Sequence, residues 1–254
     1  MRAILTYHSI DSSGSPISVS EETFKAHVRF LASGRVRVVP LGDLPAVPDS
    51  EEAVAITFDD GFRNFTTFAA SWLSGQGLPA TVFVVSDAVG GTNAWEGRDA
   101  PGIPTLPLMG WPELQATRTA GFEIGAHSRK HPDLTRLSPA RLADETAGCV
   151  ERIAAELGHR PRRFAYPYGA VNETVARVVR DVFLQSVTTD MRPLSDDDDP
   201  ALLPRLDAWY FRRAGSLEGW GTPSFRRRVW IRAQGRRVRA LIASGPWLDG
   251  GRGE

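Results

Sequence analysis

Two groups of side chains in this sequence have the types and spacing that metal chemistry requires. His127 and His131 are four residues apart, so in one turn of helix both imidazoles would lie on the same side and could bind one ion. Asp59 or Asp60 can supply a third ligand and leave one position open for water, which is typical of a catalytic site. Imidazole and carboxylate together suit Zn²⁺, and also Co²⁺, Ni²⁺ or Fe²⁺.

The two adjacent aspartates indicate a division of labour. Successive side chains in extended backbone point to opposite sides, so one carboxylate can bind the metal while its neighbour takes a proton from a metal-bound water. Each motif alone has a simpler interpretation. The histidines could be two surface residues, and Asp59, Asp60 and Gly61 could form an ordinary turn. The presence of both motifs favours the metal site.

The elements that must position these residues alternate between short apolar runs and longer amphipathic segments. This order predicts parallel βαβ units in a single α/β domain, closed into a barrel of about seven strands, with a wound open sheet as the alternative. In such a barrel the polar residues that follow the strands converge on one face, where active sites lie. The predicted strands are 3–7, 36–39, 53–58, 80–85, 122–126, 163–166 and 183–188, and the predicted helices are 21–32, 64–76, 111–119, 138–157 and 172–181.

Three segments together resemble the motifs of the polysaccharide deacetylase family, the NodB-homology group or carbohydrate esterase family 4. They are TFDDGF at 57–62, HSRKH at 127–131 and FAYPYG at 164–169. The resemblance covers roughly residues 1–210. It implies a distorted (β/α) barrel and the hydrolysis of an N-acetyl group on a sugar, which releases acetate and a free amine.

The resemblance also implies roles for individual residues. Asp59 matches the general base of the family, and Asp60, His127 and His131 match its metal ligands. Tyr168 matches the position whose backbone N–H helps to hold the tetrahedral oxyanion. The metal would polarise the acetyl carbonyl and share the charge that develops on it.

The sequence departs from the family pattern in two places. Ala165 stands where many members carry an arginine that orients the base, and we expect Arg205 to substitute for it, with a surface ion pair as the alternative. A late Leu-x-His motif, which supplies the general acid in many members, is absent because no histidine follows His159.

An early histidine offers a replacement for that acid. LTYHSI at 5–10 resembles the N-terminal Tyr-His motif of the poly-N-acetylglucosamine deacetylase branch, in which the motif order is permuted. We therefore expect His8 to protonate the leaving amine, with a structural histidine as the alternative. His27 and His159 lie on or beside predicted helices and are interpreted as surface residues.

Aromatic residues are the candidates for sugar binding. Trp95 lies in a Gly- and Pro-rich segment, 86–110, which resembles the capping loop of the same branch. Long loops in compact domains are usually functional or disordered. Trp111, Tyr166 and Pro167 complete the set of expected substrate-binding residues, although a tryptophan is more often part of a core.

Composition excludes several classes of protein. Lys and Arg total 30, as do Asp and Glu, so the net charge is zero, and we expect no nucleic-acid partner. A single cysteine, Cys149, excludes an internal disulfide and a cysteine-rich zinc site. No run approaches the roughly 20 apolar residues that cross a bilayer, and the N-terminus lacks the apolar core of a secretory signal. The chain as given is expected to be cytoplasmic, although a chain trimmed of its signal would look the same.

Residues 211–254 form a basic extension, which we expect to pack on or beside the catalytic domain of residues 1–210. The extension contains ten arginines and three acidic residues. A basic amphipathic helix of this kind can contact a membrane or bind a phosphate-bearing substrate. The alternative is a solvated helix packed back onto the barrel.

These observations favour a metal-dependent N-deacetylase acting on an N-acetylated glycan or glycolipid. Two other functions stay open. The same ligands would serve a different amide hydrolase, one that removes a formyl group or opens a cyclic imide. Ala165 and the absent late histidine leave room for a carbohydrate-binding protein without catalysis.

Overall fold

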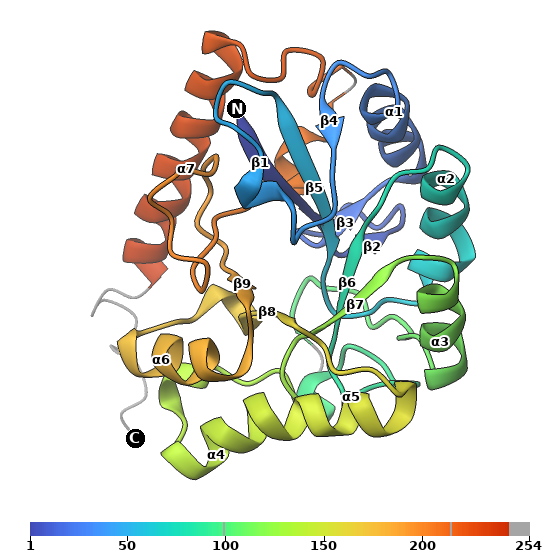
Figure 1. The fold of residues 1–254 in the computed structure, drawn as a ribbon, viewed down its shortest axis with the longest axis vertical. Helices are drawn as coiled ribbons and strands as arrows, with labels where there is room; N and C mark the ends of the chain where they lie inside the picture. The colour runs from blue at the N-terminus through green and yellow to red at the C-terminus, as the bar shows by residue number, and fades with distance from the viewer. Residues whose placement is uncertain (99, 214, 244–254) are drawn as a thin grey trace, which may run out of the picture.

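An eight-stranded, all-parallel sheet lies at the centre of the molecule (Figure 1). The computed structural model describes residues 1–98, 100–213 and 215–243. The predicted α/β fold with a curled parallel sheet is confirmed. The strand order is β10 (Leu206–Asp207), β1 (Arg2–Tyr7), β5 (Ala53–Phe58), β6 (Thr81–Val84), β7 (Glu123–Ala126), β8 (Arg163–Ala165) and β9 (Gln185–Val187), with β4 (Arg37–Val38) beside the first half of β5.

The segment 200–207 joins the two ends of this sheet. Leu203 pairs with Val187 of β9, and Leu206 pairs with Leu5 of β1. The sheet therefore curls around on itself, and this closing segment lies between β9 and β1. A separate two-stranded sheet, β2 (Ser9–Ile10) with β3 (Ser18–Val19), follows β1.

Helices cover the outside of the curled sheet (Figure 1). Ordinary capping sets their ends: Ser20 and Asn172 accept from backbone N–H groups of α1 and α6, and Gly158 ends α5 in the left-handed conformation. The predicted helices 64–76 and 138–157 each contain a π-helical turn, at Phe65–Ala69 and Asp144–Gly148. The helices are α1 (Glu21–Leu31), α2 (Ala70–Ser74), α3 (Trp111–Thr119), α4 (Pro139–Ala143), α5 (Cys149–Leu157), α6 (Glu173–Val182) and α7 (Pro223–Ala243).

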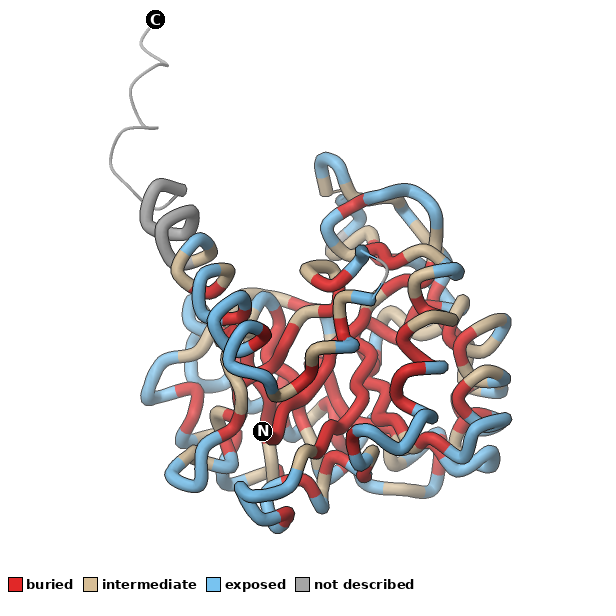
Figure 2. Tube along the Cα trace, turned by 90° about the horizontal axis from the view of Figure 1, so that it is seen from above, coloured by how far each residue is buried: buried red, intermediate tan, exposed pale blue. Residues whose placement is uncertain are grey.

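The strands are buried on both faces, as their continuous apolar sequences require (Figure 2). Alternate side chains belong to two separate cores. Leu5 and Ile56 join the large core shared with the helices, whereas Ile4 and Phe83 join a smaller core inside the barrel. Gly125 leaves room in that interior, because a Cβ there would lie 2.5 Å from the Phe83 ring.

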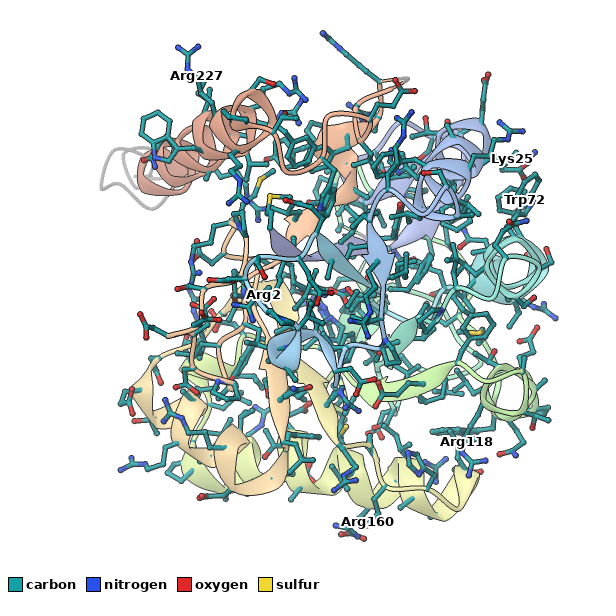
Figure 3. All side chains as sticks on the ribbon, turned by 45° about the horizontal axis from the view of Figure 1, so that its top comes forward. Arg2, Lys25, Trp72, Arg118, Arg160 and Arg227 are labelled. Carbon is teal, nitrogen blue, oxygen red and sulfur yellow. The ribbon has the colours of Figure 1, made fainter. Side chains whose placement is uncertain are left out.

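A buried arginine fills the amino-terminal end of the barrel interior. The Arg2 guanidinium donates to the Pro45 and Val47 carbonyl oxygens, at 2.9 and 3.0 Å, and pairs with Asp49 and Asp196. Figure 3 shows Arg2 in the middle of the molecule. The carboxyl-terminal end of the same interior holds a second buried arginine, Arg205, described below.

His27 was expected at the surface and is instead buried. Its Nδ1 accepts from the Tyr7 hydroxyl at 2.9 Å, and its Nε2 donates to the Phe211 carbonyl oxygen at 3.0 Å. Burial lowers the pKa of His27 to about 4, so the ring is neutral at pH 7. The buried face of α1 is wider than the apolar stripe that predicted the helix, and two polar partners let a histidine occupy it.

The C-terminal extension packs on the barrel through α7. Phe225, Val229 and Ala233 recur every four residues and are buried in the core cluster that also contains Leu206 and Ala208 of the barrel. Residues 244–254 of the predicted extension lie outside the described residues. Within the described part of the chain, no helix combines the length and the apolar character needed to span a bilayer.

Candidate active site

The turn after β5 presents the two aspartates. The Asp59 N–H donates to the Tyr7 carbonyl oxygen at 2.9 Å, which extends the pairing with β1 by one residue. Asp60 and Gly61 then take left-handed backbone conformations, with φ of 69° and 76°. The reversal separates the carboxylates, so that Asp59 contacts groups inside the barrel while Asp60 contacts His127.

Asp60, His127 and His131 form a compact and buried cluster of candidate metal ligands. The two histidine Nε2 atoms lie 3.2 Å apart, and they lie 3.4 and 3.5 Å from Asp60 Oδ1. Ligand bonds of roughly 2.0–2.1 Å in a tetrahedral site place ligand atoms about 3.3–3.4 Å apart. Asp60 Oδ1 is also buried without a hydrogen-bond partner. The cluster therefore fits a divalent ion.

The histidines converge without the helical turn that their spacing predicted. Residues 127–131 form a loop in which Ser128 and His131 are left-handed, with φ of 63° and 62°. His127 Nδ1 donates to the Ala165 carbonyl oxygen at 2.7 Å, which directs its Nε2 toward the cluster. The His131 ring stacks on Trp95 and meets Tyr168 edge-on, each with centroids 4.5 Å apart.

A buried glutamate, which the sequence did not reveal, supports this loop. Glu145 Oε2 accepts from the backbone N–H groups of Arg129 and Lys130, at 2.8 and 2.9 Å. Ser128 Oγ accepts from the His131 N–H at 2.9 Å. Glu145 lies in the π-helical turn between α4 and α5. An acidic residue in an amphipathic helix suggests a solvated face, so no sequence signal marked it.

The protonation of the cluster follows from burial and mutual contact. Burial opposes the charge on Asp60, but the close contact with the His127 and His131 rings outweighs it and lowers the pKa of that carboxyl. The same contact raises the pKa of His127 against burial. Burial and the neighbouring His127 lower the pKa of His131 to about 3. His131 is thus a neutral imidazole, the form that binds a metal.

Asp59 is held by Arg205, which is 1% exposed. The pair is bidentate, with Nη1–Oδ1 and Nη2–Oδ2 distances of 2.7 Å. Arg205 also donates to the Thr188 carbonyl oxygen at 2.8 Å and to Thr6 Oγ1 at 2.9 Å. Burial opposes ionisation of Asp59, but the guanidinium overrides it and holds the pKa of that carboxyl well below its usual range. The ion pair is buried, so the alternative interpretation of Arg205 as part of a surface ion pair is wrong.

His8 follows β1 and reaches the same face. Its Nε2 lies 3.8 Å from Asp59 Oδ2, and its side chain is 24% exposed. Asp207 in β10 lies nearby. Burial raises the pKa of the Asp207 carboxyl, against the opposing influence of the His8 ring. Sequence reasoning missed Asp207 because β10 has only two residues.

His8, Asp59 and the three candidate metal ligands line one cavity of about 170 Å³. Tyr166 is fully buried in its wall, with its hydroxyl donating to the Ala201 carbonyl oxygen at 2.9 Å. Pro167 and Trp111 are not among the lining residues, and Trp111 instead lies under the Arg152 guanidinium on α5. The lining residues are His8, Ile17, Asp59, Asp60, Asn93, Trp95, Ala100, Ile103, His127, His131, Tyr166, Tyr168 and Thr189.

The segment 86–110 places Trp95 over this cavity. Asn93 ties the segment together, since its Oδ1 accepts from the Leu106 N–H at 2.7 Å and its Nδ2 donates to the Pro104 carbonyl oxygen at 3.1 Å. The Met109 N–H donates to the Gly61 carbonyl oxygen at 2.9 Å, which fastens the segment to the aspartate turn. The position of this segment is therefore fixed by a direct hydrogen bond to the turn that carries Asp59 and Asp60.

Fold and cluster together define an α/β barrel with a candidate metal centre at the carboxyl ends of its strands. A family model of polysaccharide deacetylases matches residues 46–187, more than half of the chain. The chain belongs to the polysaccharide deacetylase family, which confirms the resemblance seen in the motifs.

Curated relatives match different shares of their own length. Bacillus subtilis YxkH is 27% identical over 209 residues, which are 80% of this chain and 70% of YxkH. The peptidoglycan-N-acetylglucosamine deacetylase PgdA of Listeria monocytogenes is 28% identical over 151 residues, which are 58% of this chain and 28% of PgdA.

Two solved structures share the fold. The Streptococcus pyogenes deacetylase PplD, in complex with acetate, has a TM-score of 0.73 at 19% identity, covering 87% of this chain and 98% of that one. IcaB from Ammonifex degensii has a TM-score of 0.67 at 23% identity, covering 82% and 93%.

Replacing Arg205 by Met should lower the free energy of unfolding by about 3–5 kcal/mol, because it leaves a charged carboxylate buried and unpaired. Chemical denaturation measures this loss. Adding Asp59→Asn to Arg205→Met removes the second charge and should recover part of the stability. An Arg205→Met protein as stable as the wild type would contradict a buried, charged pair.

Purified protein should hold about one equivalent of a divalent metal, with Zn²⁺ favoured by the donor set. Elemental analysis should show that His127→Ala loses the ion, because only two ligands remain. His159→Ala is the matched control and should keep it, since His159 follows α5 at the opposite end of the barrel. Protein that binds no metal even after reconstitution would remove the centre.

Proposed function

We propose that this protein is a metal-dependent sugar N-deacetylase, which hydrolyses an N-acetyl group of a glycan or glycolipid to acetate and a free amine. One observation carries the proposal. An ionised, buried carboxylate, Asp59, shares a cavity with the Asp60, His127 and His131 cluster. A base beside a metal centre is what hydrolysis of an unactivated amide requires.

Asp60, His127 and His131 would hold the metal, for which Zn²⁺ is our proposal. A divalent ion bound there supplies Lewis acidity toward the acetyl carbonyl and makes water more acidic. Asp59 stays outside this ligand set because Arg205 binds both of its oxygens on the barrel side. Asp59 is thereby kept ionised, and Arg205 acts as a positioning residue.

The remaining residues complete the proton transfers. Asp59 accepts a proton from the attacking water while the water oxygen bonds to the acetyl carbon. His8, 3.8 Å from Asp59, then protonates the amine nitrogen as the C–N bond breaks, and acetate leaves. The Tyr168 backbone N–H is our candidate donor to the oxyanion. Tyr168 has a left-handed φ of 59°, and its ring contacts the His131 ring.

The names of the relatives favour acetyl over formyl or imide substrates. PgdA is named a deacetylase of N-acetylglucosamine in peptidoglycan, and a Cryptococcus neoformans relative is named a chitin deacetylase. Arg205 binds both oxygens of Asp59, which is the role expected of the arginine that Ala165 replaces. This contact favours an active enzyme over a binding protein that has lost catalysis. Trp95 is the lining residue that we propose contacts the sugar. Tyr166, which was also expected to do so, is fully buried and shapes the cavity wall.

Asp59→Asn should lower kcat for acetate release from an acetylated oligosaccharide by about 10²–10⁴-fold, since general base catalysis is lost. Its metal content should be unchanged, which shows that the fold and the centre are intact. His8→Ala should also lower kcat, whereas His159→Ala should not. Full activity of Asp59→Asn would sink the mechanism. Formate release without acetate would favour a deformylase, and tight glycan binding without turnover by the metal-loaded protein would favour the binding protein.

We also propose that α7 rests on an anionic membrane surface. Its outer face exposes Trp230 and Ile231, at 62% and 50%, one helical turn after Arg227. Figure 3 shows Arg227 projecting outward from this helix. An exposed tryptophan with flanking arginines is typical of helices that lie in a lipid interface. A glycolipid substrate would be reached from that surface.

The full chain should cosediment with vesicles that contain anionic lipid and not with neutral vesicles. Trp230→Ala with Ile231→Ala should abolish most of this binding, because it removes the inserted apolar surface. Leu184→Ala is the matched control, since Leu184 is 58% exposed elsewhere on the barrel. Equal sedimentation of the α7 variant and the wild type would refute the membrane contact.

A further inference from the structure

Trp95 borders three cavities, of which the catalytic one is the smallest. A groove of about 390 Å³ adjoins it and also contains His131 and Tyr168, so it leads directly from the candidate metal centre. We call it the Arg98 groove, after the arginine in its wall. A groove of about 340 Å³, which we call the Lys130 groove, is lined by Asp87, Ala88, Val89, Gly91, Thr92, Ala94, Trp95, Arg129 and Lys130. A chain molecule with one unit in the cavity would extend into these grooves.

Positive charge predominates in the Arg98 groove. Among the described residues, its wall contains Arg98, Arg136 and Arg141 and one carboxylate, Asp133. That carboxylate is already engaged, because it pairs with Arg136 and accepts from the Thr135 N–H. Arg98 and Arg141 are exposed and form no ion pair with any described residue.

The Lys130 groove repeats this imbalance on the other side of Trp95. Its carboxylate, Asp87, pairs with Arg129 at 2.9 Å, and Arg129 also pairs with Asp144. Lys130 is exposed and has no ion-pair partner in the described part of the chain. Because the whole chain has zero net charge, the unpaired cations at the mouth of the site are a local feature.

We propose that the natural substrate is an anionic glycan. Carboxylate or phosphodiester groups on the units next to the reacting N-acetyl sugar would bind Arg98 and Arg141 in one groove and Lys130 in the other. This inference rests on the proposed deacetylase function and adds the substrate class to it. Arginine suits the role because its planar guanidinium binds carboxylates and phosphates in pairs of hydrogen bonds.

The test compares three acetylated substrates at low salt. Chitotetraose is neutral, a hyaluronan tetrasaccharide carries carboxylates, and a trimer of N-acetylglucosamine 1-phosphate carries phosphodiesters. The full, metal-loaded chain should show a higher kcat/KM on one or both anionic substrates. That advantage should shrink as salt is added, because the contacts are exposed. The substrate that gains most identifies which anion the grooves accept.

The variant Arg98→Gln/Lys130→Gln/Arg141→Gln should lose about tenfold in kcat/KM on the preferred anionic substrate and little on chitotetraose. The control variant Arg35→Gln/Arg162→Gln/Arg177→Gln removes three exposed arginines, none paired with a described residue, from outside the grooves. It should keep the preference. Equal rates on neutral and anionic substrates, or a preference that survives in the groove variant, would overturn the inference.

The failure of the proposed deacetylase function can be distinguished from the failure of this inference. If no substrate releases acetate, the deacetylase proposal fails, and calorimetric binding of the hyaluronan tetrasaccharide and the phosphodiester trimer becomes the readout. Tighter binding of either one than of chitotetraose, lost in the groove variant alone, would still support an anionic ligand. Equal affinity for the three would refute it.

Discussion

The rest of the site depends on the buried ion pair between Asp59 and Arg205. Two charges in the barrel interior are costly to desolvate, and only a bidentate geometry with further hydrogen bonds offsets that cost. Thr6 and the Thr188 carbonyl oxygen supply those bonds. The pair joins the end of β5 to the segment that closes the sheet. One interaction therefore sets the protonation of the base, its orientation and the closure of the barrel.

Backbone strain is concentrated at the same face. Asp60, Ser128, His131 and Tyr168 are the non-glycine residues with positive φ in the described part of the chain. Three of them line the cavity, and Ser128 lies in the histidine loop beside it. Each such residue costs about 1 kcal/mol or more relative to ordinary backbone. Glu145 stabilises part of this arrangement through the N–H groups of the histidine loop. The ligands are held by the loops around them rather than by regular structure.

Several elements could be predicted because their signals are local. β5 has the predicted bounds and α1 ends one residue before the predicted end. A continuous apolar run and a capped amphipathic segment are each recognisable from local sequence. The adjacent aspartates and the spaced histidines identified the residues that meet in the cluster. The motifs worked because their chemistry is carried by a few neighbouring positions.

The features that escaped prediction depend on contacts between distant segments. Two-residue strands such as β10 have no periodicity, and a π-helical turn leaves the apolar pattern of its helix almost unchanged. His27 and Glu145 are buried only because their partners come from elsewhere in the fold. Trp111 is of a residue type that often binds sugars, and only the packing of α3 shows that it lies outside the cavity.

Arg205 lies 146 residues after Asp59 along the chain. The metal-ligand cluster is complete by residue 131, whereas the partner of the base belongs to the segment that completes the barrel. Contacts over such separations form late in folding, after shorter loops have closed. A nascent or partly folded chain thus contains the candidate ligands while Asp59 still lacks its partner. Under the proposed function, activity would begin only when the fold is complete and would report on the integrity of the whole barrel.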